Sequence, residues 1–135
     1  MISFNYETNF QLENEAQRKL WISDTIANEE CLEGDINYIF CDDEYLLNLN
    51  QEYLDHDTLT DIISFDYTVG KELHGDIFIS IERVLENAKK FEVKNVDEVD
   101  RVMIHGILHY CGYKDKSDDE KSLMRSKEDF YLSRR

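Results

Sequence analysis

The order of apolar patterns along this 135-residue chain predicts one domain of the α+β or α/β class, spanning residues 1–135. Strand-like and helix-like patterns alternate at first, and two strand-like runs and three helix-like segments follow. The chain has no proline, and it shows no internal repeat and no low-complexity segment. These observations favour a mixed sheet of about four strands packed with about five helices.

The N-terminal segment predicts a strand followed by a helix. Ile2, Phe4 and Tyr6 alternate with polar residues, as expected for a half-buried strand. A helix is expected from Asn14 to about Ala27. Its inward-facing residues are predicted to be Ala16, Leu20, Trp21 and Ile26.

The next segment predicts a second strand and a second helix. Gly34–Asp35 is a predicted turn, and residues 36–41 are rich in Ile, Tyr and Phe, which is typical of a strand. Asp42 or Asp43 supplies a favourable N-cap for the helix that follows. The apolar stripe of this helix is predicted to contain Leu46, Leu47, Leu49 and Tyr53.

The middle of the chain predicts two more strands and a third helix. Residues 60–67 and 75–80 have strand patterns, and residues 69–72 form a turn between them. Ser80 is a favourable N-cap for the helix that follows. The buried stripe of that helix is predicted to contain Leu85, Ala88 and Phe91.

Two capping-box-like sequences predict the last two helices. Asn95-Val-Asp-Glu98 and Ser117-Asp-Asp-Glu120 each place an acidic residue three positions after a potential cap. Gly106 lets another element approach the first of these helices closely. The predicted buried residues of the first helix are Val99, Val102, Met103 and Ile107, and the second helix is predicted to run through Leu123, Met124 and Phe130.

The first of these helices carries the pattern that points to chemistry. His105 and His109 are four residues apart, so a helix places both imidazoles on one face. Gly112 is suited to end the helix, and Asp115 can then return to the same face. Two imidazoles and a carboxylate make a three-ligand metal site with an open position, which is typical of a catalytic zinc.

Two neighbouring residues limit this interpretation. In the zinc-protease pattern H-E-x-x-H, the residue after the first His is the general base. That position is Gly106 here, which argues against ordinary peptide hydrolysis. Cys111 is out of helical phase with the two His residues, so we expect it to fill the core rather than to bind metal.

The segment from His105 to Asp115 resembles the signature H-G-x-L-H-x-x-G-Y-D-H of the YbeY family of bacterial rRNA maturation factors, which are metal-dependent single-strand-specific endoribonucleases. The matching residues are His105, Gly106, Leu108, His109, Gly112 and Tyr113. The family's third His falls on Asp115, and the Asp before it falls on Lys114. Because a carboxylate is a harder ligand than imidazole, we expect Zn²⁺ as the cofactor but allow another divalent metal.

The resemblance extends over most of the chain from about Ile36 onward and implies a mostly parallel sheet with the metal helix beside it. The family's central segments match Leu49-Asn50, Tyr53, Asp57, Thr60 to Phe65 and Gly75-Asp76-Ile77. The family's Arg that contacts RNA phosphate falls on Leu54, and a family Pro falls on Leu59. The phosphate contact would then move to another residue, such as His56, Lys114 or Lys116.

Thr60 and Asp61 are candidates for contacts that orient the metal ligands, and His56 is a candidate for the substrate cleft. Thr60 and Asp61 are expected either to orient a ligand His, as is common around zinc, or only to begin the third strand. His56 is in turn either a cleft residue or an ordinary polar surface residue. The residues themselves leave both pairs of alternatives open.

The charge distribution indicates where RNA would bind. The formal net charge is −15, which argues against tight nonspecific binding to nucleic acid, and no DNA partner is expected. Thirteen of the fifteen basic residues lie from Lys71 onward, so RNA is expected at the C-terminal half, although most of these charges fit a salt-bridged surface.

The chain lacks the usual signals for membranes and secretion. No apolar run approaches the ~20 residues needed to span a membrane, and the N-terminal residues contain no secretory signal. The three cysteines have no C-x-x-C spacing, which is typical of reduced thiols in a cytoplasmic protein.

We therefore predict metal-assisted phosphodiester hydrolysis, with His105, His109 and Asp115 holding one Zn²⁺. The resemblance implies single-stranded rRNA near the 3′ end of the small-subunit RNA as substrate, and the small ribosomal subunit as partner. It also implies a role in rRNA maturation and ribosome quality control. The alternatives are a metalloprotease-like hydrolase and a non-enzymatic ribosome-assembly factor with a structural metal.

Overall fold

The computed structural model describes residues 1–54 and 60–135. These residues form four strands and five helices, which confirms the predicted fold class. In chain order the elements are β1 (Ile2–Tyr6), α1 (Glu15–Asn28), β2 (Leu32–Cys41), α2 (Asp43–Leu54), β3 (Ile62–Asp66), β4 (Glu72–Ser80), α3 (Ile81–Lys90), α4 (Asn95–Tyr110) and α5 (Asp118–Leu132).

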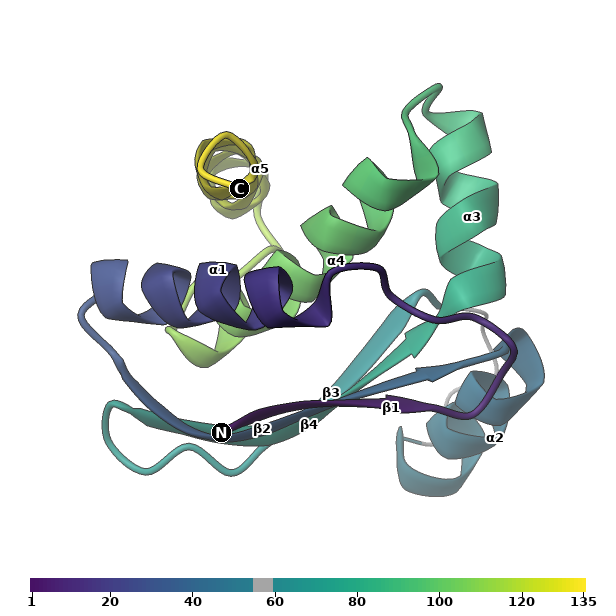
Figure 1. Ribbon diagram of the computed structural model, residues 1–135, viewed down its shortest axis with the longest axis horizontal. Helices are drawn as coiled ribbons and strands as arrows, with labels where there is room; N and C mark the ends of the chain where they lie inside the picture. The colour runs from purple at the N-terminus through teal and green to yellow at the C-terminus, as the bar shows by residue number, and fades with distance from the viewer. Residues whose placement is uncertain (55–59) are drawn as a thin grey trace.

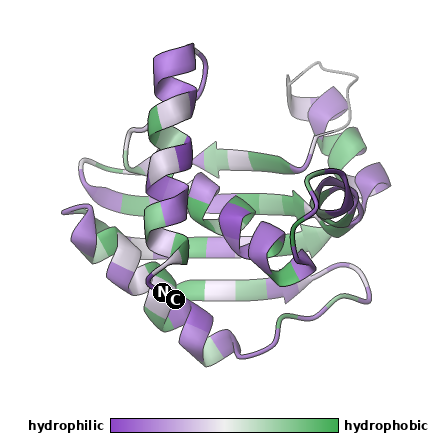
Figure 2. Ribbon diagram, turned by 90° about the horizontal axis from the view of Figure 1, so that it is seen from above, coloured by the Kyte–Doolittle hydropathy of each residue, from purple (hydrophilic) through white to green (hydrophobic). Residues whose placement is uncertain are grey.

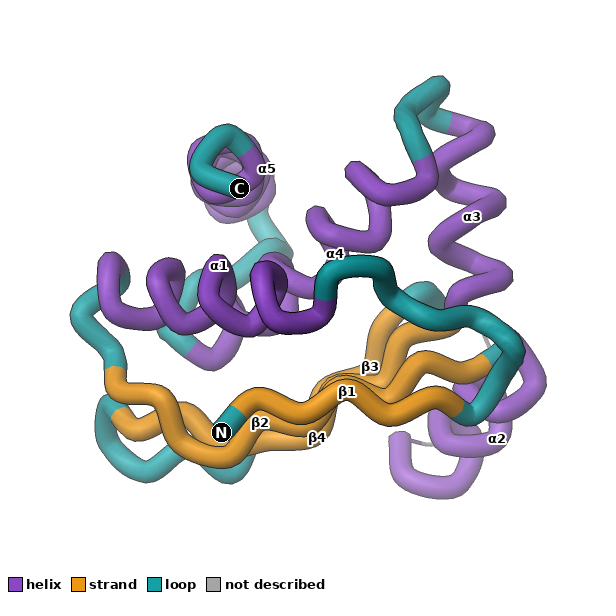
Figure 3. Tube along the Cα trace, viewed as in Figure 1, coloured by secondary structure: helices purple, strands orange, loops and turns teal. Residues whose placement is uncertain are grey.

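The strands form one mixed sheet in the order β1-β2-β4-β3. β1, β2 and β4 are parallel, and β3 pairs antiparallel with β4. Figures 1 and 3 show the sheet as one layer, with α1, α4 and α5 together above one face. Parallel neighbours require crossover connections, and the α1 helix supplies the one between β1 and β2.

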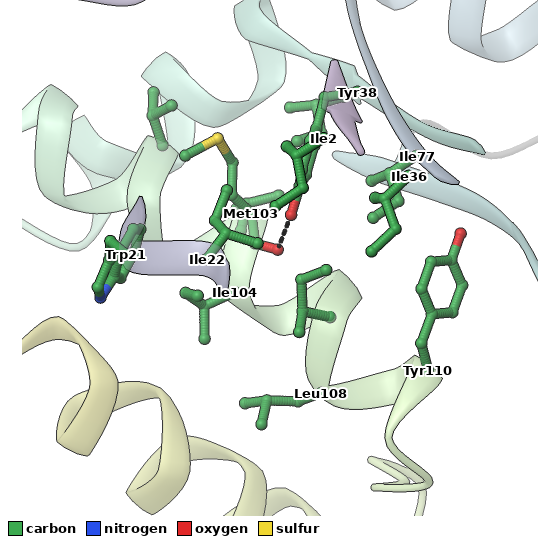
Figure 4. Packing of buried hydrophobic residues seen from close by; sticks show 14 of the residues in the cluster. Ile2, Trp21, Ile22, Ile36, Tyr38, Ile77, Met103, Ile104, Leu108 and Tyr110 are labelled. Carbon is green, nitrogen blue, oxygen red and sulfur yellow. Dashed lines mark hydrogen bonds between the residues drawn. The ribbon is translucent and has the colours of Figure 1, made fainter. Parts of the chain in front are cut away.

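The main core lies between this face of the sheet and helices α1 and α4. In Figure 2 the strands are coloured largely as hydrophobic, and the helices above them mix hydrophilic and hydrophobic stretches. Figure 4 shows how Ile36 and Ile77 from the sheet lie near the side chains of α4. The hydroxyl of Tyr38 is fully buried and donates to the carbonyl of Met103 at 2.9 Å, so the one polar atom of this ring is satisfied.

The opposite face of the sheet is covered by α2 near one end. There Cys41, Leu46 and Ile63 form a smaller buried cluster. The Asp42 carboxylate accepts from the backbone N–H of Tyr45, which confirms the predicted N-cap of α2.

Two local predictions are wrong, at Gly34–Asp35 and at the start of α4. The predicted turn at Gly34–Asp35 is an irregularity inside β2, because the pairing with β4 shifts register between Glu33 and Ile36. The Asn95 capping box is absent, since Lys94 is the N-cap of α4 and makes no side-chain cap bond. The Ser117 capping box on α5 is confirmed.

The predicted buried stripes of the helices are only partly correct. α1 buries Trp21 and Ile26 as expected, but Ala16 and Leu20 are exposed because they lie on the adjoining flank of the helix. Phe91 is also exposed, because α3 ends at Lys90 and Phe91 follows the helix. Tyr53 lies on α2, and Leu123 and Phe130 lie on α5, as predicted, and all three are exposed.

The predicted role of Gly106 is confirmed. A Cβ atom at this position would lie 3.0 Å from Cδ1 of Ile77 and 3.3 Å from Cδ1 of Ile62. α4 therefore packs closely on the sheet at Gly106, and the two His residues lie on an adjoining flank of the helix. Among the described residues, every helix is too short or too polar to cross a membrane.

Candidate metal centre

The end of α4 places the two His residues and turns the chain back toward them. Gly112 has a φ of 105°, which only glycine adopts without strain. Its N–H donates to the carbonyl of His109, and the N–H of Tyr113 donates to the carbonyl of Leu108, both at 3.0 Å. This pair of bonds is a Schellman motif, so the helix ends where the sequence predicts.

After this turn, Asp115 meets the two imidazoles. Nε2 of His105 and Nε2 of His109 lie 3.0 Å apart, and Oδ2 of Asp115 lies 3.2 Å and 3.3 Å from them. The three atoms form the one group of His, Cys, Asp or Glu ligand atoms within 4.8 Å of one another that the described residues contain. The structure thus brings together the three residues that the sequence predicts as ligands.

Each imidazole is oriented through its other nitrogen. Nδ1 of His109 lies 2.9 Å from the carbonyl oxygen of Tyr113, and Nδ1 of His105 lies 2.7 Å from Oε2 of Glu128. Both partners are acceptors, so in the neutral rings each Nδ1 carries the proton and each Nε2 presents a lone pair. Metal-binding His residues are oriented in the same way.

Glu128 is buried and bound on both sides. It lies on α5 and is 5% exposed, and its Oε1 accepts from Nη1 of Arg101 at 2.9 Å. Arg101 in turn binds Asp129 at 2.7 Å. Burial, the largest single influence, lowers the pKa of His105, but Glu128 and Asp115 raise it by more, so the pKa is raised overall.

The donor set fits a divalent cation. Two lone-pair nitrogens and a carboxylate oxygen face one point, and three such groups repel one another unless a cation or a proton lies between them. Two imidazole nitrogens and one carboxylate oxygen are ligands that zinc accepts in catalytic sites. His105, His109 and Asp115 would therefore hold a metal ion and leave a position for a further ligand.

A second network fixes the carbonyl that orients His109. The carboxylate of Glu29, at the end of α1, accepts from the hydroxyls of Tyr113 at 2.6 Å and of Tyr131, and from Lys127 at 3.3 Å. Burial, the largest single influence, raises the pKa of Glu29, but these hydrogen bonds lower it overall. The network ties the segment after α4 to both α1 and α5.

Two hollows meet at the candidate metal centre. The first, called here the α5 cleft, has a volume of 450 Å³. The residues that line it include Asp61, Phe91, Glu98, Arg101, His105, Asp115, Lys121, Arg125 and Glu128. The second, called here the lysine hollow, has a volume of 510 Å³ and is lined by His109, Lys114, Asp115, Lys116 and Glu120. Asp115 borders both.

The other predicted site residues fall in different places. Lys114 and Lys116 line the lysine hollow beside His109, and Asp61 lines the α5 cleft beside His105. Burial raises the pKa of Asp61, and His105 partly offsets this. Thr60 bonds the carbonyl of Ile62 and lines neither hollow. His56 lies outside the described residues.

Cys111 does not belong to the metal group, as predicted. It is half-buried and packs against the main core.

Sequence reasoning missed Glu128 and Arg101. Glu128 lies four residues after buried Met124 and three before buried Tyr131, so it is a charged residue inside an apolar stripe. That position was the available signal, because a buried carboxylate needs a partner.

Comparison with known proteins shows similarity over nearly the whole chain. A family model described as Endoribonuclease YbeY matches residues 2–135. A protein named Endoribonuclease YbeY from Flavobacterium johnsoniae is 67% identical over 129 residues, which cover 96% of this chain and 93% of that protein. One of the same name from Bacteroides fragilis is 46% identical over 115 residues, covering 85% and 83%.

Solved structures agree with this similarity. The solution structure of a protein from Thermotoga maritima matches the fold with a TM-score of 0.67 at 26% sequence identity. The match covers 98% of this chain and 87% of that one. Sequence and fold therefore point to the same relatives.

Proposed function

Because the chain belongs to the YbeY family of endoribonucleases, we propose that it is a metal-dependent endoribonuclease that cleaves single-stranded RNA in rRNA maturation. The observation that carries the proposal is the convergence of Nε2 of His105, Nε2 of His109 and Oδ2 of Asp115. A hydrolase that works on phosphodiesters at neutral pH needs an activated nucleophile, and this group can hold the ion that provides one.

We assign His105, His109 and Asp115 as the ligands of one Zn²⁺ ion, with another divalent metal as the alternative that the carboxylate allows. When bound, the metal ion would activate a water molecule and stabilise negative charge that develops on the phosphate. Glu128 and the Tyr113 carbonyl keep the two imidazoles in the tautomer that binds metal.

The remaining residues of the site would hold the substrate. Lys114 and Lys116 line the hollow beside His109 and would contact RNA phosphates. Asp61 lines the α5 cleft on the other side of the metal centre. There it would accept a hydrogen bond from the substrate or donate one to it. We further propose rRNA as the substrate, the small ribosomal subunit as the partner and the cytoplasm as the location; the RNA substrate is supported by the family's description as an endoribonuclease.

The protease alternative lacks its general base. Gly106 occupies the position of the protease Glu, and it packs against Ile77 and Ile62 in the core, where no catalytic side chain would fit.

The proposal is tested by whether a ligand variant loses metal binding and RNA cleavage together. Zinc-loaded protein should cleave a single-stranded oligoribonucleotide, and His109→Ala should lose both bound zinc, measured by calorimetry, and cleavage. His74→Ala is a matched control, since His74 lies on β4 and binds Asp35 and Glu72 instead. If the His109→Ala protein lost zinc and still cleaved RNA, the proposal would be wrong.

A further inference from the structure

We propose that the α5 cleft is a second RNA-binding subsite, in which Lys121 and Arg125 contact the phosphate backbone and Phe91 stacks on a base. This inference rests on the proposed function and names the groups that bind the substrate beside the metal centre.

Lys121 and Arg125 have donors available for a ligand. They are four residues apart on α5, both are exposed, and both line the cleft that His105 and Asp115 border. Arg101 lines the same cleft but is held by Glu128 and Asp129. Arg125 lies 4.0 Å from Glu128, and the described part of the chain contains no ion pair for Lys121.

The charges of the cleft favour an anionic ligand once metal is bound. Four carboxylates line it, from Asp61, Glu98, Asp115 and Glu128, against the three cations Arg101, Lys121 and Arg125. The lining is thus negative by one charge on its own and positive by one charge with a divalent ion. Lys121 has no ion pair among the described residues and Arg125 has only the 4.0 Å pair with Glu128. Both lie on α5, so a phosphate is drawn to that wall.

Phe91 offers a ring for stacking. It follows the last residue of α3, its side chain is 51% exposed, and it lines the same cleft. The ammonium of Lys90 lies 5.8 Å from the centre of the ring. Single-stranded RNA can present unstacked bases to such a ring, whereas a duplex hides its base faces.

The position of the cleft gives the strand a path. The α5 cleft and the lysine hollow meet at Asp115, with Lys121 and Arg125 on one side and Lys114 and Lys116 on the other. A single strand can therefore cross the metal centre with phosphates held on both sides. In Figure 1 the α5 helix lies above α1 and the α3 helix lies beyond α4, and both contribute to the cleft.

The charge contacts are tested by the double variant Lys121→Gln/Arg125→Gln. Binding of a labelled single-stranded RNA to the zinc-loaded protein is followed by stopped-flow fluorescence anisotropy, before cleavage proceeds, between 50 and 200 mM salt. Losing two phosphate contacts should reduce the slope of log K against log salt by about 1.4. The double variant Lys19→Gln/Lys71→Gln makes the same change in net charge at residues that do not line the cleft and should keep the wild-type slope.

The stacking contact is tested by Phe91→Ala. We expect affinity for single-stranded RNA to fall about tenfold, as for other base–aromatic contacts. Phe130→Ala is the matched control, because Phe130 is also half-exposed and carries a cation, Arg134, over its ring. It lies outside the cleft lining, so its removal should leave affinity unchanged.

The outcomes separate this inference from the proposed function. If wild-type protein binds and cleaves RNA, but both cleft variants bind with unchanged affinity and salt slope, the cleft inference is overturned and the function stands. If wild-type protein binds RNA through Lys121, Arg125 and Phe91 but does not cleave it, the proposed hydrolysis fails and the cleft inference stands. Absence of binding by wild-type protein overturns both.

Discussion

Glu128 orients the imidazole of His105. The carboxylate is buried, accepts from Nδ1 of the imidazole, and is itself held by Arg101. It has a direct contact with a proposed ligand and no direct contact with the metal position. Its influence on metal binding should therefore act through the basicity and direction of the His105 ring.

Glu128→Gln should weaken zinc binding by about 10- to 100-fold, because the ring loses a charged acceptor but keeps its place. Competition with a chelator of known affinity measures the change. Asp129→Asn is the matched control, since Asp129 also binds Arg101 but does not touch His105. Equal losses in the two variants would show that Glu128 acts only through Arg101.

The lowered pKa of Glu29 predicts that the stability of the folded protein depends on pH. In the folded protein the pKa of Glu29 lies below the ordinary glutamate value of 4.5, so the unfolded chain takes up its proton first as the pH falls. The stability from Glu29 is thus complete well above pH 4.5 and is lost as the pH drops through the lower folded pKa. Glu29→Gln should cost about 2 kcal/mol at pH 7, where hydrogen bonds to a charged group are lost.

Urea denaturation at pH 7 and at several values below 4.5 checks this prediction. The difference between wild type and Glu29→Gln should shrink as the solution becomes more acidic. Glu30→Gln alters the neighbouring exposed residue and should show no comparable difference. A gap that is constant across the acid range would contradict the prediction.

At the scale of elements, the end of α4 was predictable and the packing of α5 was not. His105, His109, Gly112 and Asp115 are close in sequence, so helical period and one glycine suffice to bring them together. Glu128 reaches His105 from another helix, and the sequence does not specify that α5 lies across α4. The order of the strands in the sheet also depends on long-range packing, so it could not be predicted from the sequence either.

The same contrast applies to the buried face of α5. Leu123 and Phe130 are apolar and correctly spaced, yet the buried positions are one residue further on, at Met124 and Tyr131. Tyr131 is buried because Trp21 donates to its carbonyl and its hydroxyl binds Glu29. These partners are on α1 and at its end, and hydrophobic period alone does not find them.

Gly112→Ala should destabilise the protein by about 1–3 kcal/mol, because a φ of 105° is unfavourable for a residue with a Cβ atom. It should also weaken zinc binding, since the same turn sets the Tyr113 carbonyl that orients His109. Gly70→Ala is the comparison, at a φ of 62°, which non-glycine residues tolerate better. Denaturation and zinc titration measure both effects, and unchanged zinc affinity would separate the turn from the metal site.

At the scale of the whole molecule, a bound metal would connect α4 to the segment that leads into α5. A ligand that binds the folded state alone stabilises it by about 4 kcal/mol at 1,000 times its dissociation constant. Removing zinc with a chelator should then lower the melting temperature by about 10 °C. Calorimetry checks this, and the His109→Ala protein should show no such shift. An equal shift in that variant would place the stabilising metal elsewhere.

The meeting of the two hollows at Asp115 has a consequence for how a polymer is engaged. A groove that continues past the reactive point in both directions imposes no requirement for a terminus. Enzymes that trim chains from an end close one side of the reactive point, whereas the described residues place a hollow on each side of Asp115. A closed ring of RNA should therefore be opened as readily as a linear strand of the same sequence.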